Sequence, residues 1–339
     1  MNYMIDDFKE DNLVEHLKSF YFFDFFNKNV LPGTDPSFNG GNINFGTRRK
    51  GFTDREEIKN ILWSGTDNIG VFEANRAYLN FYPIIPDRIE KWQKVLKESN
   101  SEEELFVEIL DIFDWGNVYA KNVSDLILLK RGKYDFNGKK IGLLEYIDSI
   151  RDNIINCKFI DHDKVIMSSG WTKVYSYAND ALLIYDSRVS AFLNYCLFMC
   201  YDDAIKHDNL TEEAKKSFRL IIQHLCNFGG TNSERVRHLK FEKGCSEFNK
   251  KTEGTDGFNA SILASKIAKC IWDNIPLEIK KEGFNGSQNE INGIRVLERA
   301  FFILGFDLKV FQVPDPSSQV PNSKSAFTAD YFSKYTFEK

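Results

Sequence analysis

The chain has 339 residues, 42% of them hydrophobic and 27% charged, and is long enough to bury one large core or two adjoining ones. Its net charge of −5 excludes a protein that coats nucleic acid through bulk positive charge, but it leaves room for one local basic face. Without an apolar run of bilayer length or a secretory signal, the sequence predicts a cytoplasmic protein with no membrane contact. The scattered cysteines and histidines lack metal-ligand spacing, so we expect reduced core thiols and no cofactor.

Most of the chain has the hydrophobic spacing of helices. In chain order, helices are predicted after the capping box at 101–104, over the apolar repeat at 143–154, after the capped start at 211–213, over 262–272 before Pro276, and over 294–304 before Gly305. Residues 39–52 read as a Gly/Asn-rich loop, and 125–137 as a short hairpin. The sequence therefore predicts a mainly α protein with three parts: an N-terminal region of unassigned role at 1–140, a second helical region at 141–312, and an extended tail at 313–339.

The segment from Gly170 to Arg188 carries the chemical prediction. Gly170 stands where a tight turn enters a helix, and the free amides of a helix N-terminus bind anions such as phosphate. Lys173 falls in the first turn of that helix. Asp186 directly precedes a second, strongly apolar helix and is placed to act as its N-cap.

An ionised, partly buried aspartate suits the cleavage of a glycosidic bond, because it stabilises the oxocarbenium-like sugar that forms as the base departs. A nearby lysine of lowered pKa can attack the sugar carbon and form a Schiff base. Each residue also has a simpler interpretation. Asp186 would then only cap its helix, and Lys173 would be a solvated helix residue.

Two separated stretches resemble helix-hairpin-helix DNA glycosylases, in particular bacterial proteins of the 8-oxoguanine-glycosylase fold. One stretch comprises Gly170-Trp171-Thr172-Lys173-Val174 and Ile184-Tyr185-Asp186-Ser187-Arg188-Val189, and the other is the R-x-L-E-x-x-x-F-x-x-G pattern at 295–305. The resemblance implies a two-lobed helical fold with a helix-hairpin-helix-like element. It also implies Lys173 as the Schiff-base lysine, Asp186 as the essential aspartate, and double-stranded DNA with a modified base as the partner. The default substrate would be 8-oxoguanine, with modified bases of phage DNA as a variant.

The chain departs from this family at two points. The G-x-G of the hairpin is reduced to Gly170, and the spacing from Lys173 to Asp186 is shorter by about four residues, more than one helical turn. These departures motivate a rival hypothesis, a non-catalytic DNA-binding or defence-complex subunit that keeps the fold. A third hypothesis is a structural helical protein with no role in nucleic-acid binding.

Several further residues are candidates for DNA contact. Within the segment these are Gly170, Thr172 and Arg188, of which Arg188 would hold a phosphate, Asp186 itself or a surface acid. Arg48 and Arg49 lie among aromatics in the Gly/Asn-rich loop, and either probe nucleic acid or belong to a solvated loop.

Arg235 and Arg237 belong to a stretch, 215–251, with nine Lys or Arg and three Glu, which suits either a phosphate grip or a solvated basic face. Trp115 and Trp171 are candidate walls of a pocket for a flipped base. The alternative for both tryptophans is core packing.

Overall fold

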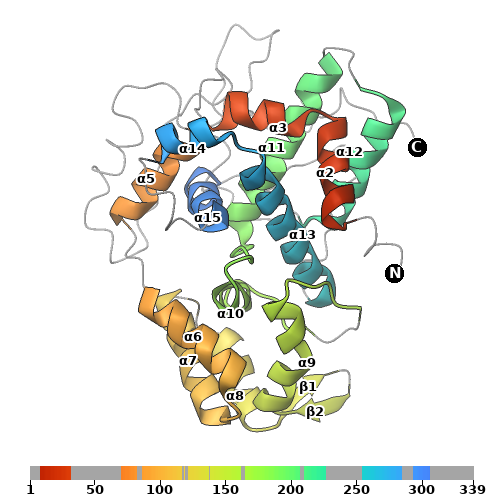
Figure 1. The fold of residues 1–339 in the computed structure, drawn as a ribbon. Helices are drawn as coiled ribbons and strands as arrows, with labels where there is room; N and C mark the ends of the chain where they lie inside the picture. Colours follow the sequence, from red (N-terminus) through yellow and green to blue (C-terminus); the bar gives the residue numbers. More distant parts are fainter. Residues whose placement is uncertain are drawn as a thin grey trace, which may run out of the picture.

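The computed structural model describes residues 8–31, 70–81, 86–116, 118, 121–136, 138–161, 165–206, 210–226, 254–284 and 293–305. Over these ranges the protein is mainly helical, as predicted, with one small hairpin (Figure 1). The elements are α2 (Glu10–Ser19), α3 (Phe22–Phe25), η1 (Phe26–Val30), α5 (Val71–Phe81), α6 (Pro86–Glu98), α7 (Glu102–Trp115), α8 (Lys121–Lys130), β1 (Tyr134–Phe136), β2 (Lys139–Ile141), α9 (Leu143–Ile155), α10 (Trp171–Ala178), α11 (Ser187–Lys206), α12 (Glu212–His224), α13 (Gly254–Asp273), α14 (Leu277–Gly283) and α15 (Gly293–Leu304). None of the described helices has the length and apolarity needed to cross a bilayer.

Local capping fixes the helix starts that the sequence predicted. Ser101 Oγ accepts a hydrogen bond from Glu104 N at 3.3 Å at the start of α7. Thr211 Oγ1 accepts one from Ala214 N at 3.2 Å at the start of α12. Each hydroxyl satisfies an amide that has no partner inside the helix, and both predicted caps are confirmed.

The hairpin lies later in the chain than predicted. Residues 121–130 form α8, in which Leu126 and Leu129 are three residues apart and buried on the same side. The antiparallel strands β1 and β2 follow, with Tyr134 opposite Ile141. The expected hairpin at 125–137 is therefore wrong in its first half, because the leucine spacing there is helical.

Two hydrophobic cores organise the described residues. The terminal core combines residues from both ends of the chain: α2, α3, η1 and α5 with α11, α12, α13 and α15. The central core is built from residues 92–184 together with Phe258 and Ile262 of α13. In Figure 1 the helices of the terminal core occupy the upper part of the molecule, and α6 to α9 with the hairpin occupy the lower part.

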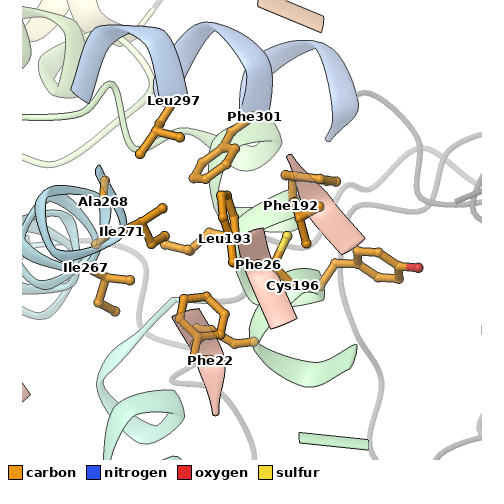
Figure 2. Close-up of a cluster of buried hydrophobic side chains, with 14 of the residues drawn as sticks. Phe22, Phe26, Phe192, Leu193, Cys196, Ile267, Ala268, Ile271, Leu297 and Phe301 are labelled. Atoms are coloured by element: carbon orange, nitrogen blue, oxygen red, sulfur yellow. The ribbon is translucent and has the colours of Figure 1, made fainter. Parts of the chain in front are cut away.

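Figure 2 shows the middle of the terminal core. There Phe22 and Phe26 meet the α11 residues Phe192 and Cys196 and the α15 residue Phe301. The ring centroids of Phe192 and Phe301 are 5.4 Å apart, a typical separation for packed aromatics. Phe26, near the start of the described chain, thus contacts the last described helix. Cys196 is a buried thiol, as predicted.

Phe136 and Ile141, on either side of the domain boundary proposed at 140/141, both belong to the central core. The described chain passes from the terminal core to the central core between Ala74 and Trp92. It returns at residues 182–185, beside the segment that carries the chemical prediction.

Candidate functional site

The segment from Gly170 to Arg188 crosses from one core to the other. Helix α10 packs in the central core and α11 in the terminal core. Between them Leu182 and Ile184 enter the central core, whereas Leu183 and Tyr185 enter the terminal core. This alternation is that of an extended chain, and we call residues 182–185 the junction. Asp186 follows the junction directly.

Asp186 caps the N-terminus of α11, and this prediction is confirmed. Its Oδ1 accepts hydrogen bonds from Arg188 N at 2.9 Å and from Val189 N at 3.2 Å. Within the described part of the chain, Oδ2 accepts no hydrogen bond. The side chain is half-buried, and the positive end of a 20-residue helix attracts its negative charge. The cap thus fixes a carboxylate at the boundary between the two cores.

Lys173 lies in the first turn of α10, as predicted, but it is not a solvated helix residue. Its side chain is only 8% exposed, and Nζ donates a hydrogen bond to Ser169 O at 2.7 Å. Its stem packs against Gly116, where an added Cβ would lie 2.7 Å from Lys173 Cδ. The ammonium is directed to the turn before α10, and none of the ion pairs between described residues joins it to Asp186.

The turn that leads into α10 is closed by its own side chains. Ser168 Oγ accepts hydrogen bonds from Gly170 N at 3.3 Å and from Trp171 N at 3.2 Å, and it donates one to Asn122 Oδ1. Gly170 has an ordinary negative φ, but a Cβ there would lie 2.6 Å from Asn122 Cγ. Glycine is needed here for close packing. The amides of Gly170 and Trp171 are thus bound to Ser168, and a phosphate at this turn would have to displace its hydroxyl.

Thr172 and Trp171 also take structural roles. Thr172 is 1% exposed, and its Oγ1 accepts a hydrogen bond from Tyr185 N at 2.9 Å, which ties α10 to the junction. The indole of Trp171 is fully buried, with its centroid 5.4 Å from that of Tyr146 and 5.7 Å from that of Phe113. Of the alternatives for Trp171, core packing describes this arrangement. Both side chains are therefore held inside the protein.

The connection that leads into α10 is long. Helix α9 ends at Ile155 and α10 begins at Trp171, so residues 156–170 lie between them. The approach to α10 is held by a pair of buried tyrosines. Tyr146 Oη lies 2.6 Å from Tyr175 Oη, Ile166 N donates to Tyr146 Oη at 2.9 Å, and Tyr175 Oη donates to Ile166 O.

Trp115 lies at the end of α7 and is half-buried. Its ring centroid is 5.2 Å from that of Tyr177 on α10. Burial raises the pKa of Tyr177 well above its ordinary value, with the charges of Tyr78 and Glu298 as further causes. Trp115 thus remains partly accessible beside α10, unlike Trp171.

The second resembling stretch packs directly on the first. Arg295 and Glu298 of α15 form a buried ion pair, with Nη1 and Oε2 2.7 Å apart. Arg295 also donates to both oxygens of Ser176 at the end of α10, and Glu298 accepts from Ile184 N in the junction. Neither residue was predicted to act on the Gly170–Arg188 segment, although opposite charges three apart within an apolar helix were a visible signal.

The end of α15 supports the cap of α11. A Cβ on Gly305 would lie 1.9 Å from Arg188 O, so only glycine fits at this contact. The guanidinium of Arg188 rests 4.2 Å from the ring centroid of Phe302. Arg188 thus holds Asp186 through its amide and α15 through its side chain.

Arg48, Arg49, Arg235 and Arg237 lie outside the described residues, as do the loop at 39–52 and the tail at 313–339. Of the basic stretch at 215–251, the structure describes residues 215–226, which end at Cys226. Tyr185 Oη bonds both the N and the O of Cys226 at 3.2 Å, and Asn194 Nδ2 donates to the same O at 3.0 Å. The path to Arg235 and Arg237 therefore starts at a residue anchored beside the junction.

Within the described ranges, no three histidine, cysteine, aspartate or glutamate side chains converge as a metal site requires. No family model, curated protein or solved structure matches the chain significantly.

Proposed function

We propose that this protein is a DNA glycosylase, which flips a modified base out of the duplex and cleaves its N-glycosidic bond at Asp186. The observation that carries the proposal is the fixed carboxylate at the junction of the two cores, held by two amides of α11. The finer fold assignment, a two-lobed glycosylase fold, belongs to the same proposal.

The reaction needs little beyond this charge. As the bond from C1′ to the base breaks, positive charge develops on the sugar, and the Asp186 carboxylate stabilises it without rearranging. Water adds to C1′, and its proton leaves with the base. Extrusion of the base costs a few kcal/mol of stacking and pairing, least for a damaged or mispaired base. Trp115 is the proposed aromatic wall for that base, because it stays half-exposed beside α10.

The packing of the two resembling stretches supports the proposal. They are more than a hundred residues apart in the chain, yet the Arg295–Glu298 pair binds the end of α10 and the junction, and Gly305 packs under the cap. Two stretches that resembled the family only by chance would not be expected to contact each other. Here both stretches fix the position of one carboxylate.

Lys173 is the proposed nucleophile if base release is coupled to strand cleavage. Its neutral amine would attack C1′ as the bond to the base breaks, and one amine proton would leave with the base. The C1′–O4′ bond would then open, O4′ would take the second amine proton, and a Schiff base would join Nζ to C1′. Nζ donates to Ser169 O, so this step requires the lysine to leave the turn and to lose a proton. The role of Lys173 as nucleophile can therefore be tested separately from the role of Asp186.

Base release from duplex DNAs that carry different lesions or modified bases tests the enzyme. We expect abasic sites with at least one substrate, and their loss in Asp186→Asn. Asp180→Asn is the matched control, because Asp180 is an exposed acid just before the junction. Release that survives in Asp186→Asn would remove Asp186 from the reaction.

Borohydride trapping tests Lys173 independently. Lys173→Met keeps the apolar stem that packs on Gly116 and removes only the amine. A covalent adduct that Lys173→Met loses identifies the nucleophile. An active enzyme that gives no adduct uses water instead.

The rival function is a non-catalytic DNA-binding subunit with the same fold. It is favoured by the hydrogen bond from Lys173 to Ser169 O and by the long connection at 156–170, both of which depart from the family pattern. DNA binding without base release from any substrate would select it.

A further inference from the structure

A row of arginines and aromatic rings runs along α15 from the cap of α11. The Arg188 guanidinium lies 4.2 Å from the ring centroid of Phe302, and Phe302 meets Tyr78 of α5 edge to face, with centroids 5.9 Å apart. The Arg299 guanidinium lies 6.0 Å from the ring centroid of Tyr78. Residues 299 and 302 are three apart in α15 and therefore share one face. We call these four residues the arginine row.

Arg299 is half-buried, and the charge of Glu298 only partly offsets the effect of this burial on its pKa. Glu298, its neighbour in sequence, is bound to Arg295 and to the junction. Among the described residues, no acid forms an ion pair with Arg299. Burial is the main cause that lowers its pKa from the ordinary value. A partly desolvated guanidinium that makes no direct ion pair within the described part of the chain is stabilised by an anion that completes the site.

We propose that Arg188 and Arg299 hold phosphates of a DNA strand, with Phe302 and Tyr78 fixing the two guanidinium planes. The inference rests on the proposed DNA substrate. Cation–π contacts reduce the freedom of the long side chains, and planar guanidinium groups bind phosphate oxygens in pairs.

A strand suits the row better than a single small anion, because the two guanidinium groups rest on different rings, Arg188 on Phe302 and Arg299 on Tyr78. A strand carries one phosphate per nucleotide and can therefore supply an anion to each of them. The row also begins at Arg188, whose amide binds Asp186. A strand held here would therefore pass beside the carboxylate proposed to act on its sugar.

Fluorescence anisotropy with labelled plain duplex DNA tests the row, with full-length Asp186→Asn as the parent protein so that no base is released. Affinity is measured over a series of salt concentrations. We expect the added change Arg299→Gln to weaken binding and to reduce the slope of log affinity against log salt by about 1, the effect of one lost phosphate contact. Arg131→Gln is the matched control. Arg131 is an exposed arginine next to the hairpin, and its substitution removes the same charge.

An unchanged slope in Arg299→Gln overturns the inference, and so does an equal decrease in Arg131→Gln, which would indicate a bulk charge effect. If Arg299→Gln does not fold, Arg299→Lys decides. It should keep the slope but lose affinity, because lysine retains the charge without the planar fork. Parental affinity in Arg299→Lys overturns the row.

The phosphate-binding role of the arginine row and the glycosylase activity can be refuted independently. Base release by the wild-type protein with an unchanged slope in Arg299→Gln removes the row alone. A reduced slope without base release from any substrate keeps the row and removes the glycosylase.

Discussion

Substitutions at Asp186 separate its charge from its role as a helix cap. Asparagine keeps an oxygen that can accept from the amides of Arg188 and Val189, so Asp186→Asn retains the cap and loses only the negative charge. Alanine removes both. If Asp186 only caps α11, Asp186→Asn should keep both its stability and its activity, and Asp186→Ala should lose some of both. If the carboxylate is catalytic, both variants should be inactive, but only Asp186→Ala should be clearly less stable.

The stability differences follow from the two hydrogen bonds. Loss of an N-cap acceptor lowers the free energy of unfolding by about 1 kcal/mol, with a range of about 0.5–2 kcal/mol. Loss of the charge alone removes its attraction to the helix dipole, about 0.3–1 kcal/mol. We therefore expect Asp186→Ala to be less stable than Asp186→Asn. Both variants lose the Asp186 carboxylate, and with it the electrostatic or acid–base catalysis it supplies. We expect the rate of base release to fall by about 100-fold or more in each.

The assay combines urea unfolding, followed by far-UV circular dichroism, with single-turnover base release on the best substrate. Asp180→Asn should match the wild type in both measurements. Wild-type rates in Asp186→Asn together with slow release in Asp186→Ala would refute the catalytic role, because charge would then be dispensable and the cap alone would matter.

Three further predictions concern the contacts that hold the site. Gly305→Ala should lower the free energy of unfolding by about 1–3 kcal/mol in urea, because its Cβ would overlap the backbone at the start of α11. Glu298→Ala should lower it by about 3–5 kcal/mol, since Arg295 is left charged and buried, and Arg295→Met with Glu298→Leu should recover most of this loss. Burial raises the pKa of Cys157 from 9.0 to about 11 and of Cys226 to about 12. The thiols of the unfolded chain ionise at lower pH than the buried ones. The free energy of unfolding should therefore be unaffected below pH 9 and should fall as the pH rises towards 11, by about 1.4 kcal/mol per thiol at pH 10. Equal urea midpoints at pH 8 and pH 10 would contradict it.

Features that depend on neighbours in sequence could be predicted from the sequence. The caps at Ser101, Thr211 and Asp186 each need only a short polar side chain before an apolar helix, and the hydrogen bonds of each cap lie within three residues. The hairpin predicted at 125–137 begins too early, because Leu126 and Leu129 have the spacing of a helix and lie in α8. Its own signal, Asn137-Gly138 before Lys139, is the sequence of a two-residue turn and was available.

Features that depend on distant residues could not be predicted in this way. Gly170 is glycine because Asn122 packs against it, and Thr172 is bound by Tyr185 N. In both cases the residue type also suits phosphate binding, so the local pattern does not distinguish the two roles. The packing of residues 8–31 with α11 to α13 and α15 could not be predicted for the same reason, since these helices are more than 150 residues away in the sequence.

The short spacing from Lys173 to Asp186 does not by itself prevent the two side chains from reaching the same substrate. A family pattern counts residues, but the distance covered depends on their conformation. Residues 182–185 alternate between the two cores, and four extended residues span up to about 13 Å, whereas four helical residues span about 6 Å. A shorter connection that is extended can therefore reach as far as a longer helical one. The stronger constraint on Lys173 is its hydrogen bond to Ser169 O, and this is why the adduct trapped with borohydride, rather than the sequence spacing, decides its role.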